Sequence, residues 1–244
     1  MSTRISMNTP TNKDVMDASQ LTALLQLSSP ALPIGGYSYS QGFEAAVDRQ
    51  LIRDEATARV WIRQQLELVI AHCEAPVWIL LFTAWADEDW QGLAYWNNWF
   101  HTSRESREMR QETGQMGWSL VKLATDLEWG QAAPRDRLAA LSTVTLPAAH
   151  AYCANVLGID KTKGLAAYLF TWLENQVMAA IKTVPLGQVS GQRILNQLRL
   201  CIPAICSEAM IRAEHQPPRI HTLAPQLAIL SSRHETQYSR LFRS

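Results

Sequence analysis

Apolar side chains recur at helical spacing along most of this chain, and this periodicity constrains the fold more than any other feature. After Asp54, a residue suited to cap a helix N-terminus, apolar positions up to Ile70 are interspersed with charges as in an amphipathic helix. Residues 161–184 are apolar enough to form a central helix, which Pro185 and Gly187 end. No tight turn lies between two segments of alternating polarity, so no β-hairpin is expected. The sequence predicts an all-α, single-domain bundle of about eight to ten helices.

Prolines and small polar residues set the expected helix boundaries. Pro76 suits the first turn of a new helix, so a separate helix is expected to follow residues 54–74. Ser103 is the expected cap of a long helix. The charged positions of its first half are expected to form a solvated face, with an interface as the alternative; they are Arg104, Glu105, Arg107, Glu108 and Arg110. Pro203 is expected to kink a later helix.

The chain divides into three expected parts. Residues 1–18 form a polar, disordered leader that lacks the apolar region of a secretion signal. Residues 19–232 hold the helices, and residues 233–244 form a separate tail. The longest apolar run, at 75–86, is shorter than the roughly 20 residues that a membrane-spanning helix needs. We therefore expect a cytoplasmic protein that does not bind a membrane.

The charge balance argues against a nucleic-acid-binding protein, and the cysteine spacing argues against a C-x-x-C redox or metal site. The 22 Lys and Arg residues balance the 22 Asp and Glu residues, so no net positive field favours nucleic acid as a partner. The four cysteines form no C-x-x-C motif, and the spacing of Cys201 and Cys206 places them on different faces of a helix. The sequence therefore predicts free, buried thiols.

Catalytic and metal-binding motifs are incomplete. The stretch KTKGLA at 161–166 does not match a phosphate-binding loop. The stretch HETQY at 234–238 begins like a zinc-protease motif, but a tyrosine stands where the second histidine is needed. His72 and Cys73 are neighbours on a helix and point about 100° apart, which disfavours a shared metal ion. No nucleotide site, zinc-protease site or tightly bound cofactor is expected from these motifs, and whether the chain binds a metal stays open.

One stretch between the helices has a different character. Residues 28–44 read SSPALPIGGYSYSQGFE. Pro33 holds Leu32 out of the helical region, while Gly35 and Gly36 can adopt backbone angles closed to other residues. This stretch is expected to form a fixed bend that either serves the fold or presents a surface.

The end of the chain combines charge with apolar anchors. The stretch SSRHETQYSRLFRS, residues 231–244, carries three arginines together with Tyr238, Leu241 and Phe242. Its plain interpretation is a frayed terminus. Arginine and aromatic side chains together are also typical of a segment that folds onto a partner.

Four separate segments resemble one protein family in the same order. They are LLQLSSPALPIGGYSYSQGFEAAV (24–47), RESREMRQET (104–113), VMAAIKTVPLGQ (177–188) and RHETQYSRLFRS (233–244), and together they look like the UreF-type urease accessory proteins. The resemblance spans nearly the whole chain, and the last segment is its most specific part. The chain departs from the family pattern only mildly within the second segment, with Ser106 in place of Thr and Met109 in place of Leu.

The resemblance implies an all-α, non-catalytic chaperone for the insertion of nickel into urease. Proteins of this family dimerise, join the accessory protein UreD (also called UreH), and recruit the GTPase UreG into the complex that activates apo-urease. The family member is thought to regulate the GTPase and to handle Ni²⁺ transiently within the complex. A homodimer with these partners is therefore expected.

The resemblance also implies two sets of contact residues. Glu44 and Lys182 match an acidic and a basic position of the family and, with Tyr37 and Tyr39, are expected to contact the GTPase. From the residues alone, Glu44 and Lys182 would be charges that complement the ends of helix dipoles. The expected contacts with UreD are Arg233, Glu235, Tyr238, Arg240, Leu241, Phe242 and Arg243.

Two other functional classes remain as alternatives. An all-α enzyme would need converging titratable groups within the bundle, and the apolar helices offer mainly Glu174, Asn175 and His150. A non-catalytic helical adaptor with an unrelated partner is the stronger alternative. Binding to a UreG-type GTPase in the presence of GTP and Ni²⁺ would distinguish the chaperone from such an adaptor.

Overall fold

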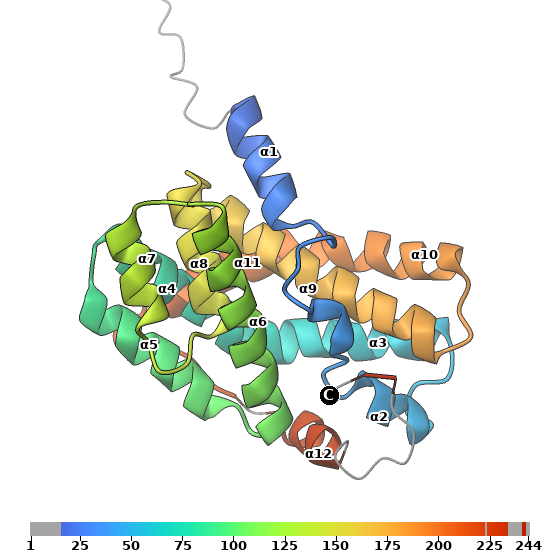
Figure 1. Cartoon of the computed structure of the whole chain (residues 1–244). Helices are drawn as coiled ribbons and strands as arrows, with labels where there is room; N and C mark the ends of the chain where they lie inside the picture. Colours follow the sequence, from blue (N-terminus) through green and yellow to red (C-terminus); the bar gives the residue numbers. More distant parts are fainter. Residues whose placement is uncertain (1–15, 223, 234–240, 243–244) are drawn as a thin grey trace, which may run out of the picture.

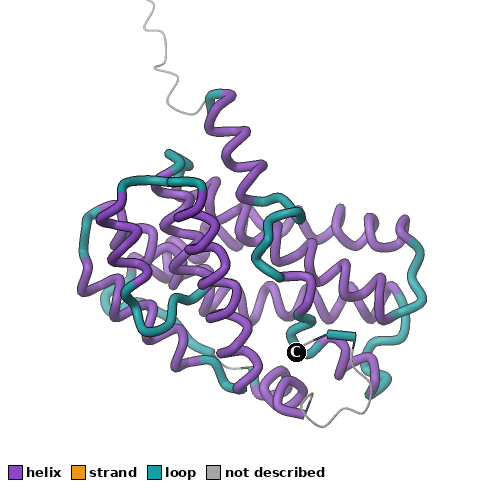
Figure 2. Tube along the Cα trace, in the orientation of Figure 1, coloured by secondary structure: helices purple, strands orange, loops and turns teal. Residues whose placement is uncertain are grey.

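The computed structural model describes residues 16–222, 224–233 and 241–242, and these residues form helices joined by loops and turns, without a strand (Figure 2). The expected all-α single-domain fold is confirmed. Most of the expected leader, residues 1–15, lies outside the described residues, as do the tail residues 234–240 and 243–244.

The helices follow one another with short connections (Figure 1). In chain order they are α1 (Ala18–Leu27), α2 (Phe43–Asp48), α3 (Glu55–Gln64), α4 (Ala75–Ala86), α5 (Trp90–Ser103), α6 (Arg107–Asp126), α7 (Ala132–Ala139), α8 (Leu146–Val156), α9 (Lys161–Thr183), α10 (Gln188–Leu198), α11 (Ile202–Glu214) and α12 (Pro225–Arg233). The 3₁₀ turns η1 (Gly36–Ser38) and η3 (Arg199–Cys201) and the π-helical η2 (Gln65–Glu74) complete the set in the described residues.

The expectation of a following helix with Pro76 in its first turn holds for α4, which begins at Ala75; the expected separation does not, because α3, η2 and α4 run on as one helix, Glu55–Ala86. Proline has no N–H, so in an α-helix the carbonyl four residues earlier loses its partner. Here that carbonyl belongs to His72, and the backbone N–H of His221 donates to it at 3.2 Å. The π-helical turn shifts the hydrogen bonding at this point, with the Ala75 N–H donating to the Ile70 carbonyl. The helix therefore passes through Pro76 without an unpaired carbonyl at His72.

The second proline-containing helix also continues. Helices α10 and α11 form one run, Gln188–Glu214, interrupted only by the 3₁₀ turn η3 directly before Pro203. The tighter turn changes the hydrogen-bond pattern at the place where the proline would otherwise disrupt it.

Helices α4 and α9 form the centre of the bundle. Helix α4 packs against α5, α8, α9 and α11, and α9 packs against α10, α11 and α2. The side chains of Trp78, Leu81 and Tyr152 are almost completely buried between these helices. Helix α6 covers α8, whereas α1 projects from the body and contacts it near α8 and α9 (Figure 1).

The boundary between α5 and α6 differs from the expectation. Ser103 ends α5, and Ser106 caps α6 by accepting the backbone N–H of Met109 at 3.1 Å. Arg104 and Glu108 are buried, so the solvated face expected for residues 104–110 is wrong at these two positions. The Arg104 guanidinium lies 3.7 Å from the Glu74 carboxylate and stacks on Phe100, so tertiary packing draws this charge inside.

All four cysteines are free, as expected, and Cys201 is the only one that is not fully buried. Burial raises the pKa of the Cys73 thiol to about 11, so this thiol is protonated at neutral pH.

Two helices are long and apolar enough to cross a membrane by composition alone, Glu55–Ala86 and Gln188–Glu214. In the first, 78% of the apolar window is buried inside the protein, as in the core helix of a bundle, and in the second the share is 39%.

Candidate functional site

Within the expected bend at residues 28–44, residues 33–42 form a loop whose turn η1 contacts α9. Gly35 and Gly42 have positive φ angles of 78° and 80°, which glycine adopts without strain. Gly36 does not need this freedom, because it begins the 3₁₀ turn η1. The Asn175 side chain on α9 donates to the carbonyls of Gly36 and Tyr39, at 2.9 and 3.4 Å. These bonds fix the loop to the central helix.

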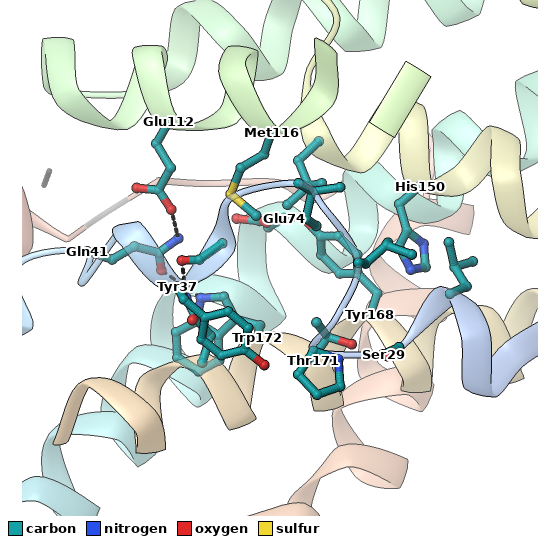
Figure 3. Close-up of a pocket in the computed structure, with 17 residues that line it drawn as sticks. Ser29, Tyr37, Gln41, Glu74, Glu112, Met116, His150, Tyr168, Thr171 and Trp172 are labelled. Carbon is teal, nitrogen blue, oxygen red and sulfur yellow. Dashed lines mark hydrogen bonds between the residues drawn. The ribbon is translucent and has the colours of Figure 1, made fainter. Parts of the chain in front are cut away.

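Gln41 joins this loop to two helices. Its Nε2 donates to Glu112 Oε1 on α6 at 2.7 Å, and its Oε1 accepts the indole N–H of Trp172 on α9 at 2.7 Å (Figure 3). The Gln41 backbone has a positive φ of 51°, an uncommon conformation for a side-chain-bearing residue, and these two bonds help to hold it there.

Beneath the loop lies a cavity of about 70 Å³, walled by α6, α8, α9 and η2 (Figure 3). Most of its lining is apolar, and its polar groups include Glu74, Glu112, His150 and Tyr168. The volume is enough for a few water molecules. It is small for a drug-sized ligand.

Several polar groups of this cavity form hydrogen bonds or ion pairs with other side chains of the protein. The Tyr168 hydroxyl donates to the Glu74 carboxylate, and the Arg104 guanidinium lies on the other side of that carboxylate. Burial raises the pKa of the Glu74 carboxyl, and Arg104 and Tyr168 oppose the shift. Burial lowers the pKa of His150 to about 3, so its imidazole is neutral and Nδ1 accepts the indole N–H of Trp78 at 3.2 Å. Within the described residues, no group of three His, Cys, Asp or Glu side chains is placed to hold a metal ion.

The end of the chain returns to the loop. Helix α12 packs against α2 and α6 (Figure 1), and the hydroxyls of Ser231 and Ser106 are 2.7 Å apart. A Cβ atom at Gly42 would lie 3.2 Å from Leu227, so a glycine allows α12 to approach the loop closely.

Glu44 binds the backbone beyond α12. Its Oε1 accepts the N–H of Leu241 at 2.7 Å and its Oε2 accepts the N–H of Phe242 at 3.1 Å. Glu44 lies in the first turn of α2 and is only 7% exposed. The Phe242 side chain is 6% exposed, whereas Leu241 is 70% exposed.

Lys182, in the last turn of α9, connects the loop and the tail. Its Nζ lies 5.3 Å from the centre of the Phe242 ring and 5.8 Å from that of the Tyr37 ring, within the range of cation–π attraction. Partial burial, and secondarily the Glu174 carboxylate, raise the pKa of the Tyr37 hydroxyl, which favours the protonated phenol.

The structure thus brings together Glu44, Lys182, Tyr37 and Phe242 from three distant parts of the chain. Glu44 and Tyr39, both expected to contact the GTPase, are buried, however: the tail covers Glu44, and Tyr39 is 6% exposed. Arg233 is the last residue of α12. The predicted contacts Glu235, Tyr238, Arg240 and Arg243 lie outside the described residues.

Sequence reasoning missed Gln41, Trp172 and the role of Asn175 in fixing the loop. Asn175 had been considered only as part of an enzyme pocket, whereas it binds loop carbonyls. A polar side chain on an otherwise apolar helix face was the available signal, since buried amides seek hydrogen-bond partners.

Comparison with known proteins assigns the family. The family model of UreF matches residues 52–199. The urease accessory protein UreF of Bordetella parapertussis is 57% identical over 220 residues, which cover 90% of this chain and all of that protein. This chain belongs to the UreF family. The UreF of Cupriavidus metallidurans is 56% identical over 225 residues, covering 92% of this chain and 98% of that protein. Over 229 residues the chain is also 58% identical to a bifunctional urease accessory protein UreEF of Bordetella bronchiseptica, covering 94% of this chain and 53% of that longer protein.

Membership of the UreF family implies a role in the maturation of urease. The relatives are named accessory proteins, which fits a UreF without an activity of its own.

Proposed function

We propose that this UreF is a non-catalytic, cytoplasmic chaperone for nickel insertion into urease. It acts as a homodimer, joins UreD (UreH) and the GTPase UreG in one complex on apo-urease, and regulates the GTPase. Ni²⁺ is cargo that the complex handles transiently. The family assignment supports this proposal, and the name UreEF of the Bordetella bronchiseptica relative describes a protein with a second accessory part beside UreF.

One observation carries the proposal beyond the family name. The residues matched to GTPase contacts, Glu44, Lys182 and Tyr37, lie within one cluster with Phe242, a residue matched to UreD contacts. If the binding of one partner is to change the binding of the other, the two contact regions must be coupled to each other. Glu44 of α2 binds the tail backbone, and Lys182 lies near both the Phe242 ring of the tail and the Tyr37 ring of the loop. These contacts supply a physical route for that influence.

The cavity favours an adaptor over an enzyme. A general acid or base needs a titratable group that can reach a substrate. Glu74 is held by Arg104 and Tyr168, and the pKa of about 3 leaves His150 a neutral, buried imidazole. These groups serve the packing of the bundle, so the contacts with partners are expected on the surface of the protein.

Urease activation in a reconstituted mixture tests the proposal. The mixture contains apo-urease, Ni²⁺, GTP, UreD and UreG, with the full chain or with a chain that stops after Arg233. This truncation keeps all of α12 and removes Leu241 and Phe242. We expect the full chain to be required, and the truncated chain to lose both activation and UreD binding while its helical circular dichroism signal persists.

The matched control is Asp48→Asn, which removes an exposed carboxylate from the same helix as Glu44 and should leave activation unchanged. Urease that activates equally well without this protein would contradict the proposal. In that case a helical adaptor with an unrelated partner becomes the better interpretation.

A further inference from the structure

We propose that ordered water molecules occupy three neighbouring cavities around Glu74 and form part of the hydrogen-bonded structure of the bundle. Each cavity is lined by at least one residue with a buried polar atom that has no hydrogen-bond partner among the described residues; these residues are His150, Arg104 and Gln65. We call the three cavities together the polar seam. The proposal concerns this chain alone and does not depend on the proposed function.

The three cavities are neighbours, because Gln41 and Glu74 line all of them. The first is the cavity beneath the loop, with a volume of about 70 Å³ (Figure 3). The second lies between η2, α5, α6 and α8, and the third lies between η2, α6, α9 and α12; each has a volume of about 20 Å³. A cavity needs about 10–15 Å³ to hold one water molecule, so each of the three has room for at least one.

His150 supplies a hydrogen-bond donor at the first cavity. Its Nδ1 accepts the indole N–H of Trp78, and its lowered pKa keeps the imidazole neutral, so the ring hydrogen is on Nε2. The side chain is 4% exposed, and no described group accepts this hydrogen. Buried donors in proteins almost always have an acceptor. A water molecule can accept the hydrogen and donate its own to a carboxylate of the same cavity, Glu74 or Glu112.

Arg104 and Gln65 bring a donor and an acceptor to the other two cavities. The terminal nitrogens of Arg104 reach Glu74 and Cys73, whereas its Nε hydrogen has no described acceptor. The Gln65 Oε1 atom has no described donor. Arg104 lines the second and third cavities, and Gln65 lines the third. A water molecule in the third cavity can therefore accept from Arg104 and donate to Gln65.

A dry seam would concentrate an energetic cost in one region. Among the described residues, five buried side-chain atoms have no hydrogen-bond partner, and three of them belong to residues of the polar seam. Each would destabilise the folded state if it stayed unsatisfied, because folding has removed it from water. Unpaired polar atoms and room for water occur together in the seam. Water that satisfies these atoms removes the cost.

A high-resolution crystal structure of the full chain tests the proposal directly. We expect ordered density in each cavity, at about 2.7–3.2 Å from His150 Nε2, Arg104 Nε or Gln65 Oε1. Nuclear Overhauser effects between water and the His150 ring N–H provide a second readout, which needs no crystal. Both measurements use the unmodified protein, so neither depends on a variant that folds.

Gln65→Met distinguishes a hydrated acceptor from an unsatisfied one. Methionine keeps the length of the side chain but removes the amide, so the water beside Gln65 should be lost while the density in the first cavity remains. If water satisfies the acceptor, its removal lowers the urea midpoint; if the acceptor is unsatisfied, its removal raises the midpoint. The matched control is Gln64→Met, at the exposed neighbouring position of the same continuous helix. It should retain all three waters and the midpoint of the unmodified protein.

Four results would overturn the proposal. Cavities without density, together with no Overhauser effect from water, would show that the seam is dry. A direct hydrogen bond from Arg104 Nε or His150 Nε2 to another protein group would remove the need for water. An anomalous scattering signal from the density would identify a metal ion in place of water. A raised urea midpoint in Gln65→Met would show that the acceptor has no partner.

Discussion

His150 illustrates how burial changes the chemistry of a single residue. From the sequence, His150 is only one of the few polar groups that an enzyme site within the bundle could use. In the structure it is 4% exposed, Trp78 donates to its Nδ1, and Nε2 has no hydrogen-bond partner among the described residues. Desolvation lowers its pKa to about 3. Because this buried imidazole is neutral, the free energy of unfolding is expected to fall as the pH is lowered.

The sign of that dependence follows from proton binding. Below about pH 6.5 the unfolded chain protonates His150, whereas the folded chain does not until about pH 3. As pH falls through this window, His150 removes up to about 1.4 kcal/mol of stability per pH unit. We expect His150→Gln, whose amide oxygen can still accept from Trp78, to flatten the decline. Urea unfolding between pH 7 and pH 4 measures the two slopes, and parallel curves would contradict a buried neutral histidine.

Glu44 is another residue whose burial could not be predicted from the sequence. The resemblance selected this residue and Lys182 as contacts with the GTPase, which stays a prediction, and it gave no indication that the tail lies on Glu44. Leu241 is 197 positions from Glu44 along the chain. A contact at that separation depends on how the whole bundle brings α2 and the tail together, and local patterns do not contain that information.

At the scale of helices, most of the fold could be predicted because periodicity and capping act locally. Asp54 caps α3 as expected, by accepting the backbone N–H of Thr57 at 2.8 Å. The missed boundaries have tertiary causes. At Pro76 the backbone hydrogen bonding shifts to a π-helical turn, and a distant residue, His221, donates its N–H to the His72 carbonyl. No pattern around Pro76 reveals that donor.

Close packing between α6 and the segment before α8 gives a prediction at this scale. From helix propensity alone, Gly117→Ala would be expected to stabilise α6 by roughly 1 kcal/mol. A Cβ atom at Gly117 would lie 2.2 Å from the Val144 carbonyl oxygen, and that backbone would have to move. Overpacking of this kind costs about 1–3 kcal/mol. We expect the contact to outweigh propensity, so that Gly117→Ala is destabilised by about 1 kcal/mol or more in urea unfolding.

Gln115→Ala is the matched control, because Gln115 is exposed on the same helix and its replacement also favours helix formation. It should be neutral or slightly stabilising. A stabilised Gly117→Ala would mean that α6 and residues 143–145 are less closely packed than the structure indicates.

For the whole molecule, one continuous core joins both halves of the bundle. Helix α4 contacts α5 and α8 on one side and α9 and α11 on the other. The buried apolar side chains form a single cluster that runs from Leu27 near the start of the described chain to Phe242 near its end. Because no boundary divides this cluster, the described helices are expected to lose their packing together.

Tryptophan fluorescence and circular dichroism can test this cooperativity, because they sample different parts of the bundle. Five of the nine tryptophans, Trp78, Trp85, Trp90, Trp96 and Trp99, lie on α4 and α5, whereas the helical signal comes from every helix. If the core unfolds as one unit, urea titrations followed by the two probes have the same midpoint and slope. If α9, α10 and α11 unfolded separately, the circular dichroism transition would be broader than the fluorescence transition. A Glu44→Gln variant adds a second condition: it replaces one of the two oxygens that accept tail N–H groups, so its two probes should shift together and keep a common midpoint.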